Sequence, residues 1–337
     1  MLRFLFLALV ALATLLGGCG SDKAAGKPGE PKLPVASRTL CLYSELDSSF
    51  TTDLVESFNK TNKDGLKVQF LGELKAGEPL PDVVLAEQRT LYGLKQQQKL
   101  QPAKLALASR LPAKLQDKEG YWYGVFYDPA VLLVNQYFAR TIGQSSLKGW
   151  TDLENNEKLR IAMENLSDSN STQNFLGSLA DSMGETTSLN YLWNINRFVG
   201  QYAKFPFTSI RMTAVGDADV AITRQSYVFK YLENKFPAYV VHPKEGTPVN
   251  LYCVGLFKDC SAEQKKAALQ FMSWLMSSDR VQAVAQTHNT GYMFIFPRGV
   301  DAKPVDADKL WLNTSYLEAA KQEALTNRWL ERVRFSK

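Results

Sequence analysis

Four short polar segments of the sequence each follow an apolar run, and their side chains could bind a ligand. They carry hydroxyl, carboxylate, amide, guanidinium and phenol groups: Ser44, Glu45 and Asp47; Glu87 and Gln88; Ser169, Ser171 and Thr172; Arg224, Gln225 and Tyr227. Each segment lies where a predicted strand ends and a predicted helix begins. Ligands of open α/β sheets bind outside the carboxyl ends of the strands, so the four segments together predict one binding site. Taken singly, each could instead cap its helix, because Ser, Thr and Asp are favoured N-caps.

The third segment favours an anionic ligand. Residues 167–172 precede a predicted helix, whose free backbone N–H groups and positive dipole end attract anions. Arg89 and Arg224 could add charge, because a guanidinium group binds oxyanions through two parallel hydrogen bonds. We therefore expect phosphate, phosphonate, sulfate or carboxylate, either free or as part of an organic solute.

Carboxylates near the same segments leave a cationic ligand such as a polyamine open. An ammonium group would need acidic partners and an aromatic wall, for which the sequence offers Glu45, Asp47, Glu87, Asp128, Trp122 and Tyr123. The two aromatic side chains could equally be packed in the core.

Catalytic and metal motifs are missing from the sequence. It contains no GxSxG, HExxH or CxxC motif, and its two histidines, His242 and His288, are far apart. The charges, 39 Lys and Arg against 34 Asp and Glu, give a net charge of +5, which is too small to indicate nucleic-acid binding. The sequence thus predicts a binding protein without a cofactor, and neither an enzyme nor a nucleic-acid partner.

The elements that must position these segments alternate along the chain. Short apolar strands at 40–43, 66–71, 82–86, 160–163 and 219–222 are interleaved with amphipathic helices such as 51–60, 91–100 and 262–276. This alternation is typical of the α/β class. A length of 337 residues allows two domains.

The first residues read as an export segment. Residues 1–18 contain Arg3, an apolar run and small residues, the pattern of a signal peptide. The junction LGGC resembles a bacterial lipobox, which predicts cleavage before Cys19 and a lipid anchor on that residue; an ordinary signal peptide is the alternative. Residues 19–37, rich in Gly, Pro and Lys, read as a flexible tether. We expect a lipid-anchored protein of the cell envelope, exposed to the periplasm or the cell exterior.

Three cysteines follow the tether. Outside the cytoplasm, Cys253 and Cys260 could form a disulfide, whereas Cys41 lies in an apolar strand and is expected to be buried. Three free thiols are the alternative.

An ordered set of motifs resembles one family. The segments LCLYSELDSSFTTDLVESFNKT, PDVVLAEQRTLYGLKQQQKLQP, GYWYGVFYDPAVLLVNQYF, VGDADVAITRQSYVFKYL and NLYCVGLFKDCSAEQKKAALQFMSWL follow the order of extracellular solute-binding protein family 1. These are type II periplasmic binding proteins of ABC importers. The resemblance covers about residues 38–300.

The resemblance implies a two-lobed α/β fold with two hinge crossovers. It predicts a first lobe of residues 38–135 and 249–300, a second lobe of residues 136–248, and a helical C-terminal segment, 301–337, packed on the body. The protein would be a monomer that closes over a small molecule or ion and delivers it to an ABC permease.

The resemblance leaves the solute open. Ferric members use two adjacent tyrosines near the position of Tyr227, where this sequence has a lone tyrosine that Asp47 could assist. An anion or an anionic organic solute such as a phosphonate is therefore favoured, with ferric iron, a polyamine or a thiamine-type solute as alternatives. A structural lipoprotein without a small ligand is the second alternative.

Overall fold

The computed structural model describes residues 39–72, 81–142, 147–155, 158–232, 236–277, 279–297, 299 and 303–336. The predicted signal peptide, Cys19 and the tether lie outside the described residues. Within these ranges, every helix is too short or too polar to cross a membrane.

The first lobe is built on a mixed sheet whose order is β2-β1-β3-β10-β5, with β4 and β11 at its margins. Its strands are β1 (Thr39–Ser44), β2 (Lys67–Phe70), β3 (Val83–Glu87), β4 (Leu100–Gln101), the first half of β5 (Trp122–Asn135), β10 (Thr247–Phe257) and β11 (Met293–Phe294). Strands β1, β2 and β3 are parallel, whereas β10 is antiparallel to both β3 and β5. The carboxyl ends of β1 and β3 therefore meet at one edge.

Helices cover this sheet because their apolar residues recur at helical spacing. They are α1 (Ser48–Thr61), α2 (Gln88–Gln96), α8 (Ala262–Ser277) and α9 (Asp279–Thr287), with short 3-10 turns at Ala106–Arg110 and Ala113–Leu115. In α1 the buried side chains include Phe50, Leu54 and Phe58. They belong to a core that also contains β1, β3, α8 and the first half of β5.

The second lobe has its own sheet, in the order β5-β8-β6-β7, with β9 pairing on β5. The strands are β6 (Ile161–Glu164), β7 (Val199–Ala203), β8 (Val220–Arg224) and β9 (Ala238–Val241). Its helices are α3 (Gln136–Ile142), α4 (Asn170–Met183), α5 (Glu185–Asn196), α6 (Pro206–Val215) and α7 (Gln225–Leu232), with a 3-10 turn at Trp150–Leu153. Two separate core clusters fill this lobe.

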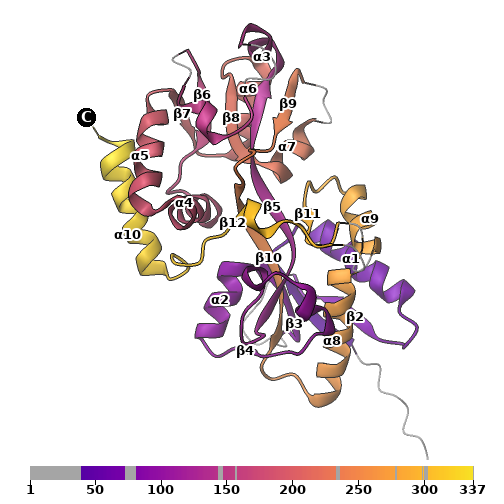
Figure 1. Cartoon of the computed structure of the whole chain (residues 1–337). Coiled ribbons are helices and arrows are strands. Elements are labelled where there is room, and N and C mark those ends of the chain that lie inside the picture. Colours follow the sequence, from indigo (N-terminus) through magenta and orange to yellow (C-terminus); the bar gives the residue numbers. More distant parts are fainter. Residues whose placement is uncertain are drawn as a thin grey trace, which may run out of the picture. The chain divides into compact units, whose positions relative to one another are not determined.

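Strand β5 passes from one sheet into the other (Figure 1). As far as Pro129 it pairs with β10, and from Ala130 onward it pairs with β8 and β9. Proline lacks the N–H that a sheet ladder needs and therefore suits the residue at which pairing changes. Strand β10 carries a second proline, Pro248, where it leaves the first sheet to pair with β12.

Strand pairing therefore puts the first crossover at Pro129 and Ala130, rather than at the expected lobe boundary after Asn135. Residues 130–135 pair with second-lobe strands, and their side chains lie in the second lobe's core. An apolar run alone does not show where its partners change, because every residue of β5 is buried.

The C-terminal segment packs on the second lobe (Figure 1). It comprises a 3-10 turn (Ala307–Lys309), β12 (Leu310–Trp311), α10 (Ala319–Trp329) and a π-helical turn (Leu330–Arg334). Leu325, Trp329 and Val333 join the second lobe's core. The Glu185 carboxylate accepts hydrogen bonds from Tyr316 and Arg328, both at 2.9 Å.

The three cysteines within the described residues are free thiols. Cys253 is buried in β10, whereas Cys41 and Cys260 are half-buried. A disulfide between Cys253 and Cys260 is thus not formed.

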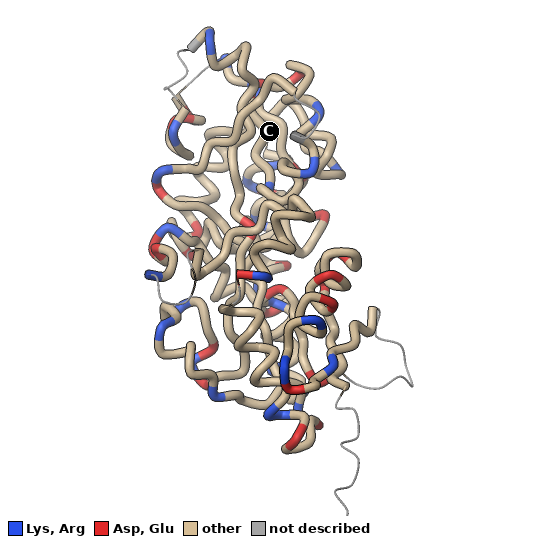
Figure 2. Tube along the Cα trace, turned by 90° about the vertical axis from the view of Figure 1, so that its right-hand side faces the viewer, with Lys and Arg blue, Asp and Glu red and all other residues tan. Residues whose placement is uncertain are grey.

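Charged residues of both signs are interspersed along the described chain (Figure 2). This distribution matches the small net charge.

Candidate functional site

Three cavities lie close to the crossing of β5 and β10. The central cavity has a volume of about 350 Å³ and is lined by Glu45, Asp47, Ser49, Phe50, Arg224, Ser226, Tyr227, Lys230, Tyr252, His288, Thr290 and Tyr292. The small cavity holds about 30 Å³ and is lined by Asp128, Ala130, Met163, Glu164, Leu166, Ser171, Thr172, Phe175, Ile222, Thr223, Arg224, Pro248 and Asn250. The third, which we call the amide cavity, measures about 230 Å³.

Volume separates the central cavity from the small one. A volume of about 30 Å³ has room for one or two water molecules and no larger solute. The central cavity, at about 350 Å³, falls within the range of small-molecule sites. Among the cavities described, it is the one that combines this size with charged side chains from both lobes.

Arg224 lines both the central and the small cavity, and only 15% of its side chain is exposed. Its guanidinium carbon lies 4.3 Å from the centre of the Tyr227 ring, and the guanidinium donates a hydrogen bond to the Tyr227 hydroxyl. Burial acts to lower the pKa of Arg224, but Asp128, Tyr227, Tyr252 and Glu87 outweigh it, so the pKa is raised and the cation persists.

Asp128 is the closest counter-ion, with its Oδ2 3.9 Å from Arg224 Nη1. The carboxylate is 1% exposed and accepts two hydrogen bonds from Ser226, from the backbone N at 3.0 Å and from Oγ at 2.5 Å. Burial raises the pKa of Asp128, while Arg224 and the Ser226 hydrogen bonds oppose that shift. Asp128 on β5 therefore caps the start of α7 from outside the β8–α7 junction.

Tyrosines from three elements surround the same cavity. Tyr227 comes from α7, Tyr252 from β10, and Tyr292 from the segment before β11. The hydroxyls of Tyr252 and Tyr292 hydrogen-bond each other, and Tyr252 also hydrogen-bonds the Glu87 carboxylate. Burial raises the pKa of all three phenols, which are therefore neutral donors and acceptors at physiological pH.

Glu87 begins a hydrogen-bond path between the lobes. Asn250 Nδ2 on β10 donates to Glu87 Oε1 at 3.3 Å and to Ser171 Oγ on α4 at 2.6 Å. Asn174 Nδ2 donates to Asn250 Oδ1 at 2.7 Å. Burial raises the pKa of Glu87, an effect that Arg224 partly opposes.

Further contacts join the two lobes directly. Gln225 Nε2 donates to the carbonyl of Gly291 at 2.5 Å, and Arg89 Nη1 donates to Gln173 Oε1 at 3.2 Å. Gly291 has φ +69°, and a Cβ there would lie 3.0 Å from the Gln225 carbonyl oxygen and 3.0 Å from Ser226 Cα. Only glycine permits this approach of the two backbones.

The predicted residues of the first loop largely serve the helices. Asp47 Oδ1 accepts from the backbone N atoms of Ser49 and Phe50 and so caps α1. Glu45 accepts from the Glu87 backbone N at 3.0 Å and from Thr90 Oγ1 at 2.8 Å, at the start of α2. Both carboxylates nevertheless line the central cavity, where Asp47 Oδ2 lies 3.9 Å from Lys230 Nζ.

Four of the predicted residues line none of the cavities described: Ser44, Glu87, Gln88 and Ser169. Ser44 is buried and accepts from the Leu46 backbone N and Thr51 Oγ1, both at 3.2 Å. Gln88 is buried in the first turn of α2. The expected aromatic wall, Trp122 and Tyr123, lies in the first lobe's core and lines none of the cavities described. The polyamine hypothesis therefore loses these two residues, although other aromatic side chains, Phe50, Tyr252 and Tyr292, line the central cavity.

At the predicted anion site at the start of α4, several of the hydrogen-bonding groups already bond to one another. Ser169 Oγ accepts from the Thr172 backbone N at 3.1 Å, and Thr172 Oγ1 accepts from the Ser169 backbone N at 3.2 Å. This capping box satisfies backbone groups that an anion would otherwise use. Ser171 and Thr172 still line the small cavity.

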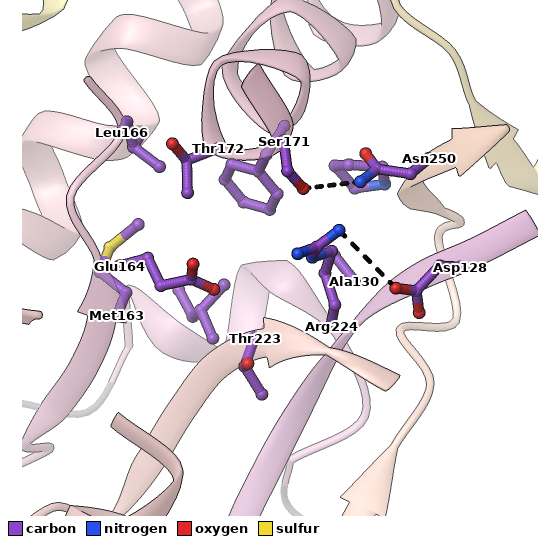
Figure 3. Close-up of a pocket in the computed structure, with 13 residues that line it drawn as sticks. Asp128, Ala130, Met163, Glu164, Leu166, Ser171, Thr172, Thr223, Arg224 and Asn250 are labelled. Carbon is purple, nitrogen blue, oxygen red and sulfur yellow. Dashed lines mark hydrogen bonds and ion pairs between the residues drawn. The ribbon is translucent and has the colours of Figure 1, made fainter. Parts of the chain in front are cut away.

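Glu164 and Arg224 point into the small cavity from opposite sides (Figure 3). Burial raises the pKa of Glu164, and Arg224 opposes that shift. The Thr223 hydroxyl in the same wall is buried without a hydrogen-bond partner. The cavity thus combines an acidic and a basic side chain with a largely apolar wall, and its volume suits water.

Several residues that line the central cavity were not expected from the sequence. Lys230 belongs to α7 and Tyr252 to β10, and the loop that follows α9 supplies the others: His288, Thr290 and Tyr292. Of these, only Tyr252 could have been suspected from the neighbouring sequence, because its polar-tipped side chain stands two residues after Asn250 in a β-strand. The loop after α9 carried no such signal.

A metal site built from His, Cys, Asp and Glu alone is absent among the described residues. A cation in the central cavity would therefore depend on the phenol oxygens of Tyr227, Tyr252 and Tyr292, together with the carboxylate of Glu45.

The family model for bacterial extracellular solute-binding proteins matches residues 78–318. The chain belongs to this family, and its predicted two-lobed α/β periplasmic-binding-protein fold is confirmed. Family and fold are those of binding proteins and not of enzymes. None of the curated proteins compared matches the chain.

Solved structures of the same fold cover most of the chain. The fructose-6-phosphate-bound periplasmic binding protein AfuA of Actinobacillus pleuropneumoniae is 17% identical, with a TM-score of 0.64 over 89% of this chain and 100% of that one. Trichodesmium FutA in complex with iron and citrate is 19% identical, with a TM-score of 0.69 over 88% and 100%. Iron-bound HitA of Pseudomonas aeruginosa is 16% identical, with a TM-score of 0.66 over 87% and 99%. At these identities the likeness concerns the fold.

Proposed function

We propose that this solute-binding protein serves an ABC importer and captures a small organic anion in the central cavity, with the anionic group on Arg224. The observation that carries the proposal is the buried guanidinium, which faces a cavity of about 350 Å³. A guanidinium has five N–H donors, and its contacts with Asp128 and Tyr227 leave donors for a ligand oxygen. A phosphonate or carboxylate suits such a planar fork.

The side chains on the opposite wall of the cavity indicate a second polar group that the solute should carry. Glu45 and Asp47 are exposed acceptors, and the neutral phenols of Tyr252 and Tyr292 can donate or accept. A solute with an amino or hydroxyl group beside its anionic group would satisfy both walls. An aminoalkylphosphonate is the chemical class that meets these conditions most simply.

Capture would proceed by rotation of the lobes about the two crossovers. The lobes meet through Asn250 and Ser171, Arg89 and Gln173, and Gln225 and Gly291. A monomer in this state would present the solute to a membrane permease. Lipid on Cys19 would hold the protein near that permease in the cell envelope.

Ferric iron is a second candidate, and a specific observation favours it. The sequence offered only Tyr227 as a phenol ligand, whereas the fold adds Tyr252 and Tyr292 at the same cavity. Ferric iron prefers hard oxygen ligands such as phenolate and carboxylate. Because Arg224 is cationic, iron there would need an accompanying anion such as citrate. HitA and FutA, two proteins of the same fold, hold iron in their structures.

The test is a titration panel on the mature protein after removal of any bound solute by unfolding and refolding. Isothermal calorimetry would compare phosphate, methylphosphonate, 2-aminoethylphosphonate, citrate, ferric citrate and spermidine. The variant is Arg224→Met, and Arg211→Met, at an exposed position on α6, is the matched control. Loss of a buried charge contact should weaken binding of the organic anion by about 30-fold or more.

The outcomes separate the candidates. Tight binding of a phosphonate that Arg224→Met abolishes and Arg211→Met retains supports the organic-anion function. Binding of ferric citrate, with a visible phenolate-to-iron absorption band that Tyr227→Phe shifts, supports iron instead. Equal affinities of wild type and Arg224→Met for every anion would exclude Arg224 from the site.

A further inference from the structure

The amide cavity differs from the central cavity in having no charged side chain among its lining residues. Its volume is about 230 Å³, and its wall is made of amide, hydroxyl and aromatic groups: Gln225, Phe229, Gln282, Ala285, Gln286, Asn289, Thr290, Gly291, Tyr292 and Phe294. The central cavity includes Glu45, Asp47, Arg224 and Lys230. The two cavities thus suit different chemical groups.

Gln225 supplies an acceptor that has no partner. Its side chain is 5% exposed, its Nε2 donates to the Gly291 carbonyl, and its Oε1 is buried without a hydrogen bond. A buried acceptor without a donor is costly, and most buried polar side-chain atoms in proteins have a partner. Gln225 lines the amide cavity, so a turn of its side chain toward the cavity would let a ligand hydroxyl or amide N–H satisfy this oxygen.

The cavity is assembled from both lobes. Gln225 and Phe229 come from α7 in the second lobe, whereas α9, its following loop and β11 in the first lobe supply the rest. Asn289 holds its backbone at φ +47° and donates from Nδ2 to the Phe229 carbonyl at 2.9 Å. The neighbouring Gly291 makes the close backbone approach to Gln225 described above. The cavity therefore exists only when the lobes are in contact.

Two residues connect this cavity to the central one. Thr290 and Tyr292 line both, so the two spaces lie on either side of a shared wall. We infer that the amide cavity is a second binding subsite, one that takes an uncharged group bearing hydroxyls or amides. This group is either the far part of the captured solute, in which case the inference rests on the proposed function, or a separate neutral molecule.

The experiment measures affinities of three kinds of probe for the full mature protein. Inorganic phosphate is the anion alone, glycerol 3-phosphate and fructose 6-phosphate carry an anion and hydroxyls, and glycerol and fructose are the neutral parts alone. The variants are Gln225→Leu and Phe229→Ala, the second at a partly exposed side chain that tolerates truncation. Gln97→Leu, at an exposed position after α2, is the matched control.

If the solute spans both cavities, Gln225→Leu and Phe229→Ala weaken the binding of the hydroxylated phosphates by about tenfold and leave the affinity for phosphate unchanged. If a separate molecule binds, glycerol or fructose binds to wild type and the same variants remove that binding, whether or not the anions bind. The second result would stand even if Arg224→Met showed the proposed function to be wrong.

Two results would overturn the inference. One is that the variants leave the affinity for every probe unchanged, or change the affinities for phosphate and for the hydroxylated phosphates by the same factor. The other is that no hydroxyl-bearing probe binds more tightly than its matched phosphate and no neutral probe binds at all. Melting curves for each variant establish that the comparison concerns folded protein.

Discussion

The loop between β1 and α1 and the junction where β8 runs directly into α7 occupy equivalent places, since each follows a strand and opens a helix. In the first, Asp47 caps α1 from within the loop. In the second, the capping carboxylate is Asp128, which arrives from β5 and accepts from the Ser226 backbone N. Because a distant residue caps α7, the side chains at the junction do not serve as its cap, and Arg224 at the end of β8 and Tyr227 in the first turn of α7 line the central cavity.

The largest effect should come from removing the distant cap. Asp128→Ala leaves the Arg224 charge buried without its contacting carboxylate and should lower the free energy of unfolding by about 3–5 kcal/mol. Urea unfolding measures this change. The matched control is Asp219→Ala, because Asp219 is also buried but its partner Arg160 has a side chain that is 56% exposed and can be hydrated. If the two variants lose equal free energy of unfolding, the buried contact between Asp128 and Arg224 has no special weight, and the comparison between the two strand-to-helix connections fails.

Tyr227→Phe should separate ligand contact from folding. The ring that stacks on Arg224 is retained, and the hydroxyl that accepts the Arg224 hydrogen bond is lost, so the melting temperature should fall by only a few degrees. Affinity for the organic anion should fall by about tenfold, because one hydrogen bond to a charged group is removed. Calorimetry would compare it with Tyr137→Phe, whose side chain is 63% exposed on α3. Unchanged affinity would argue against a ligand role for the β8–α7 junction.

Asp47→Ala tests the self-capped loop. Loss of the cap on α1 should cost about 1 kcal/mol of stability, and Asp47→Asn should restore most of it, because asparagine is an equally good cap. The loss of affinity should be smaller than for Tyr227→Phe. A larger loss would mean that the first loop binds the ligand as directly as the β8–α7 junction does.

The smallest effect concerns pH and Glu164. Burial raises its folded pKa above the ordinary value of 4.5, so the folded protein binds the proton more tightly than the unfolded chain. This contribution to stability is complete below about pH 4.5 and is lost as pH rises through the folded pKa. Glu164→Gln should therefore be more stable than wild type at neutral pH, with a difference that stops changing below that value. Parallel stability curves between acidic and neutral pH would contradict this.

The pattern of residue types over a few positions was enough to predict those strands and helices that depend on neighbours in the sequence. The strand ending at Ser44 and the helix from Ser48 follow from an apolar run, a cap and apolar residues at helical spacing. The start of α4 was expected too late: residues 170–172, expected before the helix, form its first turn, because Ser169 is its N-cap. The C-terminal segment, predicted only as helical over 301–337, has α10 beginning at Ala319, because Glu318 and the residues before it are extended or turned.

The sequence by itself determined the α/β class, most of its strands and helices in order, and the four polar segments at strand ends, because each depends on residues a few positions apart; α5, β7 and α6 were not predicted. Only the tertiary structure decided which side chains meet. Strand β5 is buried along its whole length, so alternation cannot show that Asp128 faces Arg224, nearly a hundred residues away. Tyr252 and Tyr292 reach the same cavity through the pairing of β10 and β11 with β5, a register set by long-range packing.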